Sequence, residues 1–305
     1  MLREEKITEN GIITIDKVEE SIRYLKAFEP HNGEGYFLAF SGGKDSCVLK
    51  SLADKAGVKY DAHYHVTSVD PPELVRFIRK YHPDVIFDYP KDARWDEKKQ
   101  EDVEYTVTMW NLIPQKAMPP TRLVRYCCEY LKEGGGAGRK CLTGVRKAES
   151  ARRARDRALV NLGNNKATSK MLMNDNDESR EIVENCYQRM KTLINPIIDW
   201  SDEDVWEYIK AENLPCCELY DKGFKRIGCI GCPMSTKAAQ ELERYPKYKQ
   251  AYLRAFEKML INNKAKGITN KCNWETAQDV MDWWLGLGNQ TDEAQMQMLE
   301  SEDEE

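Results

Sequence analysis

The sequence lacks the features that mark membrane-spanning, exported and strongly basic proteins. No apolar run approaches the roughly 18 residues of a membrane-spanning helix, so we expect no membrane partner. No apolar segment of the export type follows the charged residues Met1–Lys6, and we therefore expect a cytoplasmic protein. Charge of neither sign dominates, because 46 basic residues oppose 51 acidic ones and the net charge is −5. No global basic field marks the chain as a nucleic-acid binder.

Cysteine is plentiful, although the export signal that would suit a disulfide scaffold is missing. Ten cysteines occur, and in a reducing cytosol clustered thiols usually serve a metal ion or catalysis. Two groups stand out, the vicinal pair Cys127 and Cys128 and the CxxC motif at Cys229 and Cys232. A CxxC places two thiolates on one turn, where both can reach the same metal. These four residues are the candidate metal ligands.

Other arrangements of the thiols stay open. Four thiolates suit either Zn²⁺ or an iron–sulfur cluster, and spacing alone does not separate the two. The second vicinal pair, Cys216 and Cys217, competes with the first, which can also be read as two ordinary buried thiols. Packing roles are expected for the remaining cysteines: Cys47, Cys141, Cys186 and Cys272.

A glycine turn between an apolar run and a helical pattern is the most informative stretch. The run Tyr36–Phe40 is typical of a buried parallel strand, and a helical pattern resumes after Ser41-Gly42-Gly43. This layout points backbone N–H groups and the positive end of a helix dipole at an anion. The glycines let a phosphate approach the main chain, Ser41 and Ser46 add hydroxyl donors, and Asp45 could hold Mg²⁺. The loop lacks the Walker A and G-x-G-x-x-G spacings, and the alternative is an ordinary turn.

Strands alternate with helices over much of the chain, which predicts βαβ units and an α/β fold with a Rossmann-like parallel sheet and flanking helices. Strands are expected at 36–40, 60–67, 84–88 and 140–145. Helices are expected at 15–28, after the glycine turn, around 74–78, from Ser201 to 209, at 245–261 and at 274–287. The predicted domains are 1–235, a helical C-terminal segment at 236–290 and an acidic disordered tail at 291–305, with a mobile loop at 161–180.

Several segments, taken together, resemble one family. Ser41–Ser46 after a strand resembles the pyrophosphate-binding loop (PP-loop) of the adenine-nucleotide alpha-hydrolase-like superfamily. Thr121–Lys132, which includes Cys127 and Cys128, is similar to the Cys-Cys segment of PAPS/APS (phosphoadenosine and adenosine phosphosulfate) reductases. Thr143–Arg152 is similar to their Gly-hydrophobe-Arg-x-x-Glu-Ser segment. The similarity continues, in order, through Asn195–Trp200, Asp204–Trp206 and Leu214–Gly223 to the CxxC. Over about residues 36–235 the chain is thus identified as a member of the PAPS/APS reductase family.

The resemblance implies a set of site residues and cofactors. It implies that an adenine nucleotide, either ATP or APS/PAPS, binds with Mg²⁺ at the loop, and that Cys127, Cys128, Cys229 and Cys232 hold a [4Fe–4S] cluster. The catalytic residues it implies are Lys44, Asp45 and Arg146. The nucleotide-binding residues it implies are Ser41, Gly42, Gly43, Asp45, Ser46, Thr67, Gly144, Arg146, Lys147 and Arg152.

One departure from the family bears on the reaction. Family reductases that cleave the sulfate use a cysteine near the C-terminus, in a Glu-Cys-Gly-Leu-His-type segment, and no segment here matches it. We therefore expect ATP-dependent adenylation and sulfur transfer, as the similarity to relatives without that cysteine implies. A phosphoadenylyl-sulfate or adenylyl-sulfate reductase is one alternative, with Cys272 or a partner supplying the nucleophile. A zinc-stabilised nucleotide-binding module without turnover is another.

The basic block 139–157 bears on partners. It holds eight basic and two acidic residues. It can be read as a phosphate-binding cluster at the nucleotide site, as a contact for a nucleic-acid acceptor, or as a solvated helix face. The other partners we consider are the adenine nucleotide, a sulfur donor protein and a second copy of this chain.

Overall fold

The chain folds into two compact units. The computed structural model describes residues 2–8, 11–96, 100–162, 170–171, 191–268 and 272–287. One unit, here called the sheet unit, comprises Met1–His65, Pro72–Asp88 and Gly135–Ile227. The other, the helical unit, comprises Val66–Pro71, Tyr89–Gly134 and Gly228–Glu305. Within this unit the helices of the C-terminal part pack with residues 89–134, whereas the predicted boundaries at 235 and 290 stay predictions.

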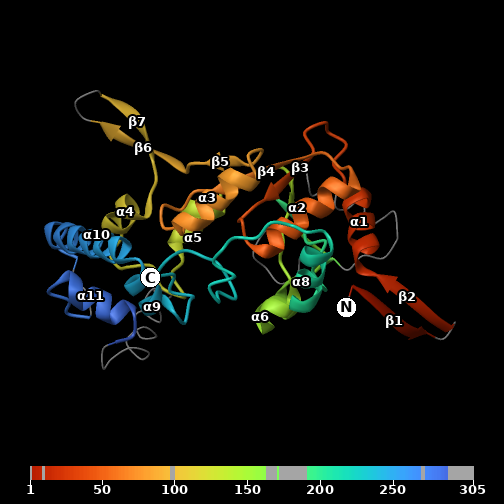
Figure 1. The fold of residues 1–305 in the computed structure, drawn as a ribbon. Coiled ribbons are helices and arrows are strands. Elements are labelled where there is room, and N and C mark those ends of the chain that lie inside the picture. The colour runs from red at the N-terminus through yellow and green to blue at the C-terminus, as the bar shows by residue number, and fades with distance from the viewer. Residues whose placement is uncertain are drawn as a thin grey trace. The chain divides into compact units, whose positions relative to one another are not determined.

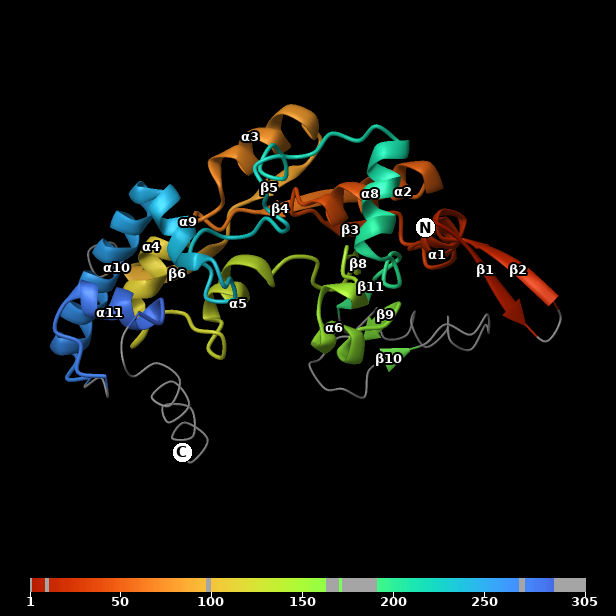
Figure 2. The same ribbon diagram turned by 60° about the horizontal axis from the view of Figure 1, so that its bottom comes forward.

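The sheet unit is built on a mixed sheet that is mostly parallel (Figures 1 and 2). In the described ranges its strand order is β10-β9-β11-β8-β3-β4-β5. Strands β11, β8, β3, β4 and β5 pair in parallel, whereas β9 and β10 are antiparallel. The strands are β3 (Tyr36–Ala39), β4 (Tyr60–His65), β5 (Ile86–Asp88), β8 (Lys140–Leu142), β9 (Val160–Leu162), β10 (Lys170–Met171) and β11 (Thr192–Ile194). The predicted α/β class with a central parallel sheet is confirmed.

Helices flank this sheet and bury its apolar side chains. They are α1 (Lys17–Ala27), α2 (Lys44–Ala56), α3 (Pro72–Tyr81), the 3₁₀ turn η2 (Lys147–Glu149), α6 (Ala151–Asp156) and α8 (Asp202–Ala211). The predicted start of α8 is confirmed, because the Ser201 side chain accepts from the Asp204 N–H and the Asp204 side chain accepts in return. Leu38 of β3 and Leu49 of α2 have no exposed surface, which places the core between sheet and helices.

The strand order creates a switch point beside β3. From β3 the chain runs outward to β4 and then β5, and it later returns to place β8 on the other side of β3. In sheets of this kind, ligands bind at the carboxyl ends of the two strands where the order reverses. The glycine turn follows β3, and Gly144 follows β8, so both lie at that position.

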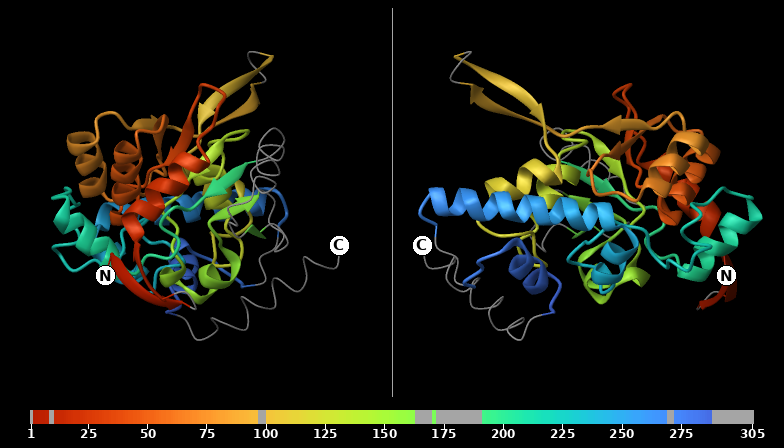
Figure 3. Two further views of the ribbon diagram at one scale, coloured as in Figure 1. Left: turned by 90° about the vertical axis from the view of Figure 1, so that its right-hand side faces the viewer. Right: turned by 60° about the vertical axis from the view of Figure 1, so that its left-hand side comes forward.

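The helical unit is built around aromatic side chains. Its elements are the hairpin β6 (Lys91–Asp96) and β7 (Glu101–Thr106), α4 (Met109–Leu112), η1 (Ile113–Gln115), α5 (Tyr126–Lys132), α9 (Ala238–Arg244), α10 (Pro246–Ala265) and α11 (Ala277–Trp284). The long helix α10 packs against η1 and α11 (Figure 3). Tyr252 and Phe256 of α10 contact Trp284 of α11, whose indole N–H donates to the Pro120 carbonyl at 2.6 Å. No helix in the described ranges is long and apolar enough to cross a membrane.

Two hairpins were not predicted. One joins β1 (Arg3–Thr8) to β2 (Gly11–Asp16), and the other is β6–β7. Their strands are short and rich in charged residues, so any alternation of apolar and polar residues is brief. The predicted mobile loop 161–180 lies outside the described residues except at β9 and β10, and the predicted disordered tail 291–305 lies outside them altogether.

A charged network ties three strands of the sheet unit together. Arg139 donates to both carboxylate oxygens of Asp61, at 2.8 Å for one of them, and to the Tyr36 carbonyl at 2.9 Å. The two ring nitrogens of His63 lie 2.5 Å from Asp61 and 2.8 Å from Asp88. The hydrogen bond from Arg139, helped by His63, lowers the pKa of Asp61 from 3.8 to about 2.

This shift predicts a loss of stability in acid. Because the folded-state pKa of Asp61 lies below its unfolded value, its contribution is present above about pH 4 and disappears as the pH falls towards about 2. We expect the unfolding free energy that is lost on acidification to be smaller by about 1 kcal/mol in Arg139→Met than in the unchanged protein. This is less than the full pKa shift implies, because Asp61 is partly exposed. Urea unfolding at pH 5, 4 and 3 measures it. Equal slopes of unfolding free energy against pH in both proteins would contradict the assignment.

Candidate functional site

The glycine turn is shaped by Gly42. Gly42 has φ of +71°, and a Cβ there would lie 2.7 to 2.8 Å from side-chain carbons of Ile78 and Leu74. Only glycine fits such a position without strain. Gly43, the N-cap of α2, has φ of −77°, and a Cβ there would meet Ser41 Oγ and Tyr220 Oη at 3.4 Å, an ordinary contact distance. Gly42 therefore sets the turn, whereas a Cβ at Gly43 would fit with ordinary contacts.

Hydroxyl groups occupy the hydrogen-bonding positions of the turn. The Lys44 N–H donates to Tyr220 Oη at 2.8 Å, and the Gly43 N–H donates to Ser41 Oγ at 3.4 Å. Ser46 Oγ donates to the Gly43 carbonyl at 2.9 Å. The turn thus presents N–H groups at the start of a 13-residue helix, where the helix dipole favours an anion. A phosphate oxygen can take the place of the hydroxyl acceptors.

Four charged side chains form a network at the end of the turn. Arg146 donates from Nε to Asp45 at 2.6 Å and from a terminal nitrogen to Asp202 at 2.7 Å. Lys44 Nζ lies 3.1 Å from both Asp45 and Asp202. Arg146 is 1% exposed, so this network fixes its guanidinium. Gly144 lets the end of β8 approach, because a Cβ there would lie 3.1 Å from the Asp45 backbone.

The network controls the ionisation of its members. Burial raises the pKa of Asp202, but hydrogen bonds from Arg146 and Lys44 outweigh it and hold that pKa below its ordinary value. Burial likewise disfavours the charged form of Arg146, but the attraction of Asp45 and Asp202 leaves its pKa above the ordinary value. These shifts favour the charged forms of both Arg146 and Asp202.

The remaining predicted nucleotide-binding residues are Thr67, Lys147 and Arg152. Thr67 belongs to the helical unit, where its hydroxyl lies 3.5 Å from Cys229 Sγ. Lys147 bonds to Asp199 at 2.6 Å on the surface. Arg152 lies in α6, and its side chain is outside the described part of the structure. The structure therefore brings together Ser41–Ser46, Gly144 and Arg146 among the predicted residues.

Two site residues were missed from the sequence. Asp202 contacts both Lys44 and Arg146, and Tyr220 contacts the Lys44 N–H. Asp202 follows the N-cap Ser201 and was read only as the start of a helix. Tyr220 lies in a segment that resembles the family, and that similarity was the only sequence signal for it.

The vicinal cysteines begin helix α5. Cys127 and Cys128 lie in its first turn, and a terminal nitrogen of Arg125 donates to Cys128 Sγ at 3.1 Å. The hydrogen bond from the Cys127 thiol, followed by that from Arg125, lowers the pKa of Cys128 and makes it the thiolate of the pair. The same bond raises the pKa of Cys127, with burial and the nearby charges of Cys229 and Cys232 adding to the effect.

The CxxC motif is a tight turn fixed from both sides. The Ile230 N–H donates to the Val69 carbonyl at 2.8 Å, and Tyr252 Oη donates to the Ile230 carbonyl at 3.0 Å. Gly231 has φ of +70°, and a Cβ there would lie 3.2 to 3.3 Å from side-chain atoms of the core. Burial raises the pKa of the Cys229 thiol, and the neighbouring Lys132 ammonium partly opposes this.

All four predicted ligands thus belong to the helical unit and interact electrostatically. Their donor chemistry suits thiolate-bound metal. As the side chains lie, however, no three His, Cys, Asp or Glu residues in the described ranges are placed to hold a metal ion. The competing pair, Cys216 and Cys217, belongs to the sheet unit, close enough to buried Cys47 to raise its pKa further.

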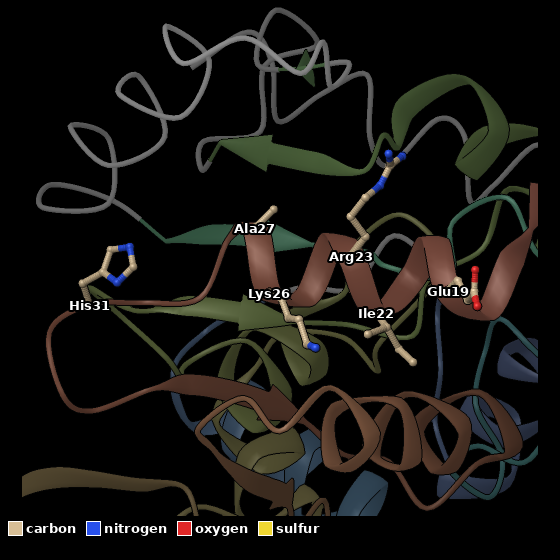
Figure 4. A pocket seen from close by; sticks show the side chains of 6 residues that line it. All are labelled: Glu19, Ile22, Arg23, Lys26, Ala27 and His31. Atoms are coloured by element: carbon tan, nitrogen blue, oxygen red, sulfur yellow. The ribbon is translucent and has the colours of Figure 1, made fainter.

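An open pocket of about 580 Å³ lies along α1 in the sheet unit (Figure 4). It is lined by Glu19, Ile22, Arg23, Lys26, Ala27 and His31, and includes no residue of the glycine turn. Figure 4 shows the Arg23 and Lys26 side chains pointing in different directions, so they do not converge on one ligand.

Several known proteins are similar to this chain. An uncharacterised protein of Methanocaldococcus jannaschii is 27% identical over 259 residues, covering 80% of this chain and 52% of that protein. This chain thus spans about half the length of its curated relatives from that archaeon. A phosphoadenosine 5'-phosphosulfate reductase of Xanthomonas oryzae is 25% identical over 226 residues, covering 73% of this chain and 83% of that protein.

Among solved structures, the phosphoadenylyl-sulfate reductase from Candida auris has a TM-score of 0.42 and 20% identity, covering 70% of this chain and 87% of that one. The phosphoadenosine phosphosulfate reductase domain matches residues 35–235. That range is more than half of the chain, and it contains the glycine turn, the Gly144–Arg146 segment and both cysteine groups. The chain belongs to the phosphoadenosine phosphosulfate reductase family.

Proposed function

We propose that this protein binds ATP with Mg²⁺ at the Ser41–Ser46 turn, adenylates an acceptor oxygen and then replaces that oxygen with sulfur. The observation that carries the proposal is the network of Lys44, Asp45, Arg146 and Asp202 at the switch point of the sheet.

The two carboxylates of the network favour a metal–triphosphate over a bare sulfonucleotide. Asp45 and Asp202 stand at a turn built to receive an anion, where they would repel an unneutralised phosphate or sulfate. Mg²⁺ removes this conflict, because it is usually held by one or two carboxylates together with substrate phosphates. Lys44 and Arg146 remain as cations that can neutralise charge on the departing pyrophosphate.

The adenylation step balances without a redox partner. A lone pair on the acceptor oxygen forms a bond to the α-phosphorus, and the bond from that phosphorus to the bridging oxygen breaks. Pyrophosphate leaves with the electron pair, and the proton of the acceptor passes to water. A donor protein then supplies sulfur at the sulfide level, which displaces AMP from the activated carbon.

Reduction of a sulfonucleotide, the activity named for several relatives, requires a thiolate nucleophile. Cys272 is the candidate in this chain, and burial raises the pKa of its thiol. A raised pKa lowers the thiolate fraction at neutral pH, which disfavours Cys272 in that role. The reductase alternative therefore needs a nucleophile from another source.

Dependence on Mg²⁺ tests the choice of nucleotide. We expect chelation of Mg²⁺ to lower ATP affinity at least tenfold, about 1.4 kcal/mol, and Asp202→Asn to lower the affinity for Mg²⁺-ATP comparably. Isothermal titration with ATP and with PAPS measures both effects. The control is Glu203→Gln, which makes the same charge change at the exposed neighbouring residue of α8. PAPS binding tighter than ATP binding, with sulfite released in the presence of thioredoxin, would restore the reductase.

We also propose that Cys127, Cys128, Cys229 and Cys232 hold a [4Fe–4S] cluster, with Zn²⁺ the alternative. Support comes from their shared unit and from the cations Arg125 and Lys132, which favour the thiolates. Binding requires the thiols to turn towards one another from their present positions. The cluster would supply iron-bound sulfide and electron-transfer capacity, and no part of the adenylation depends on it.

Metal analysis of cysteine variants tests this assignment. Protein purified without air should be brown and contain iron, and each Cys→Ser change at the four positions should lower bound iron and thermal stability together. The matched control is Cys216→Ser, because Cys216 is a vicinal cysteine of the sheet unit. The Cys216→Ser protein should keep its iron. Colourless protein with stoichiometric zinc would support the zinc alternative, and iron loss in Cys216→Ser would show that the ligand set is wrong.

A further inference from the structure

The glycine turn is bonded to a hydroxyl from a distant part of the chain. The first N–H of helix α2, that of Lys44, donates to Tyr220 Oη at 2.8 Å, although the two residues are 176 positions apart. A Cβ at Gly43 would lie 3.4 Å from the same oxygen. Both segments belong to the sheet unit. The phenol oxygen therefore lies against the main chain of the turn, where a bound phosphate would approach.

Tyr220 covers one of several N–H donors at the start of α2. The Cys47 N–H donates to the Gly43 carbonyl at 3.1 Å and so makes the first bond of the helical pattern. The N–H groups of Asp45 and Ser46, which come before it, meet no acceptor among the residues that the structure describes. A phosphate that bound these two N–H groups would also come within reach of the Lys44 N–H, and would meet the phenol there.

The acceptor is a neutral phenol. Burial raises the pKa of Tyr220, and the hydrogen bond from the Lys44 N–H only partly opposes this. Hydrogen bonds to an ionised oxygen are roughly twice as strong as those to a neutral one. A phosphate oxygen should therefore bind the Lys44 N–H more strongly than the phenol does.

The backbone of Tyr220 is fixed, whereas its ring lies near the surface. Next to it in the chain, Leu219 is fully buried, and the Tyr220 carbonyl accepts from the Gly223 N–H at 3.0 Å. The ring packs edge-on against Trp206 of α8, with centroids 5.3 Å apart, and Trp206 is 40% exposed. Asp202, which pairs with Lys44, lies one turn earlier on the same helix. The ring can therefore turn away from the N–H without moving its own backbone, and Trp206 would sense that movement.

We propose that Tyr220 determines the affinity of the turn for phosphate, because its hydroxyl competes with a phosphate oxygen for the Lys44 N–H. The hydroxyl is displaced when phosphate binds and returns when phosphate leaves. Its return stabilises the turn, which weakens the binding of pyrophosphate and favours its release. That pyrophosphate is a product rests on the proposed function, whereas the competition itself does not.

Binding of inorganic pyrophosphate with Mg²⁺ tests the competition in the full-length protein. Tyr220→Phe keeps the ring and removes the hydroxyl. We expect it to bind pyrophosphate about fivefold more tightly than the unchanged protein, which corresponds to about 1 kcal/mol, and isothermal titration measures this. Pyrophosphate should also change the tryptophan fluorescence of the unchanged protein, and Trp206→Phe should remove most of that change. A fluorescence change that persists in Trp206→Phe would show that the ring of Tyr220 stays in place.

The matched control is Tyr208→Phe. It removes a hydroxyl of α8 that lies 3.1 Å from Ser51 Oγ, on helix α2 but away from the turn. Its affinity for pyrophosphate should equal that of the unchanged protein.

Three results would overturn the proposal. Weaker binding by Tyr220→Phe would make the hydroxyl a direct ligand of phosphate, and equal binding would show that no phosphate reaches the Lys44 N–H. Failure of both the unchanged protein and Tyr220→Phe to bind pyrophosphate would show that the turn is no phosphate site. Tighter binding by Tyr220→Phe in a protein that adenylates no acceptor would support the competition and contradict only the proposed function.

Discussion

Gly42→Val is expected to abolish measurable ATP binding and to lower the free energy of unfolding by at least about 2 kcal/mol. The residue has φ of +71°, a conformation that β-branched residues avoid, and its Cβ would overlap side-chain carbons of Ile78 and Leu74. Valine must therefore shift either the turn or α3, and a shift of the turn displaces the N–H groups that we propose bind the phosphates. Isothermal titration with Mg²⁺-ATP and urea unfolding of the same samples measure the two effects.

Gly43→Val is the matched control for the fold. Its backbone conformation is one that any residue adopts, and its Cβ has van der Waals room. We expect this variant to stay folded but to lose at least tenfold in ATP affinity, about 1.4 kcal/mol, because it adds bulk where phosphate must approach. Unchanged affinity in a folded Gly43→Val protein, or normal ATP binding by Gly42→Val, would remove the nucleotide from this turn.

Arg146→Met should produce the second large effect. The change leaves Asp45 and Asp202 facing each other with only Lys44 between them, and removes the buried donor to the Trp200 carbonyl. Removing one partner of a buried ion pair typically costs about 3–5 kcal/mol, and partial exposure of both carboxylates lowers our expectation to about 2–3 kcal/mol. Adenylation should fall by about 10²- to 10³-fold if the guanidinium stabilises charge on the departing pyrophosphate.

The position beside Arg146 offers a stability control. Lys147→Met removes a cation of the same segment, but among the described residues its partner is exposed Asp199, so the free energy of unfolding should change by less than about 0.5 kcal/mol. Urea unfolding separates the two variants. Pyrophosphate release is then compared under conditions where Arg146→Met remains folded. Equal stability of the two variants would show that the network of Asp45, Arg146 and Asp202 does not form in solution.

The glycine turn could be predicted because it depends on residues that lie close together in the sequence. Tyr36–Phe40, the two glycines and Ser46 are contiguous, and a strand, a glycine turn and a helix start can be read from period and residue type alone. The capping box at Ser201 is equally local, and it too was predicted correctly. Arg146 was placed at the site only through resemblance to a family, and the structure brings it to Asp45.

What the sequence did not show depends on contacts between distant segments. Asp202 and Tyr220 reach Lys44 across more than 150 residues, and nothing in their own neighbourhoods marks them as partners of that lysine. Thr67 was expected at the nucleotide only through resemblance to the family and stays a prediction there; in the structure its hydroxyl lies 3.5 Å from Cys229 Sγ. In β7 of the second hairpin, Val103 and Tyr105 are partly buried between exposed residues, and so short an alternation gave little strand signal.

The helical unit cannot close until the ribosome has made α10 and α11, because its three stretches of chain are separated by parts of the sheet unit. Between Gly134 and Gly228 lie roughly 90 residues, which take about 5–20 s to synthesise. Throughout that interval Leu112 and Ile113 lack the aromatic side chains of α10 that bury them in the finished protein. Cys127 and Cys128 likewise wait for Cys229 and Cys232. A metal that needs all four thiols would therefore be inserted only after Cys232 has emerged from the ribosome.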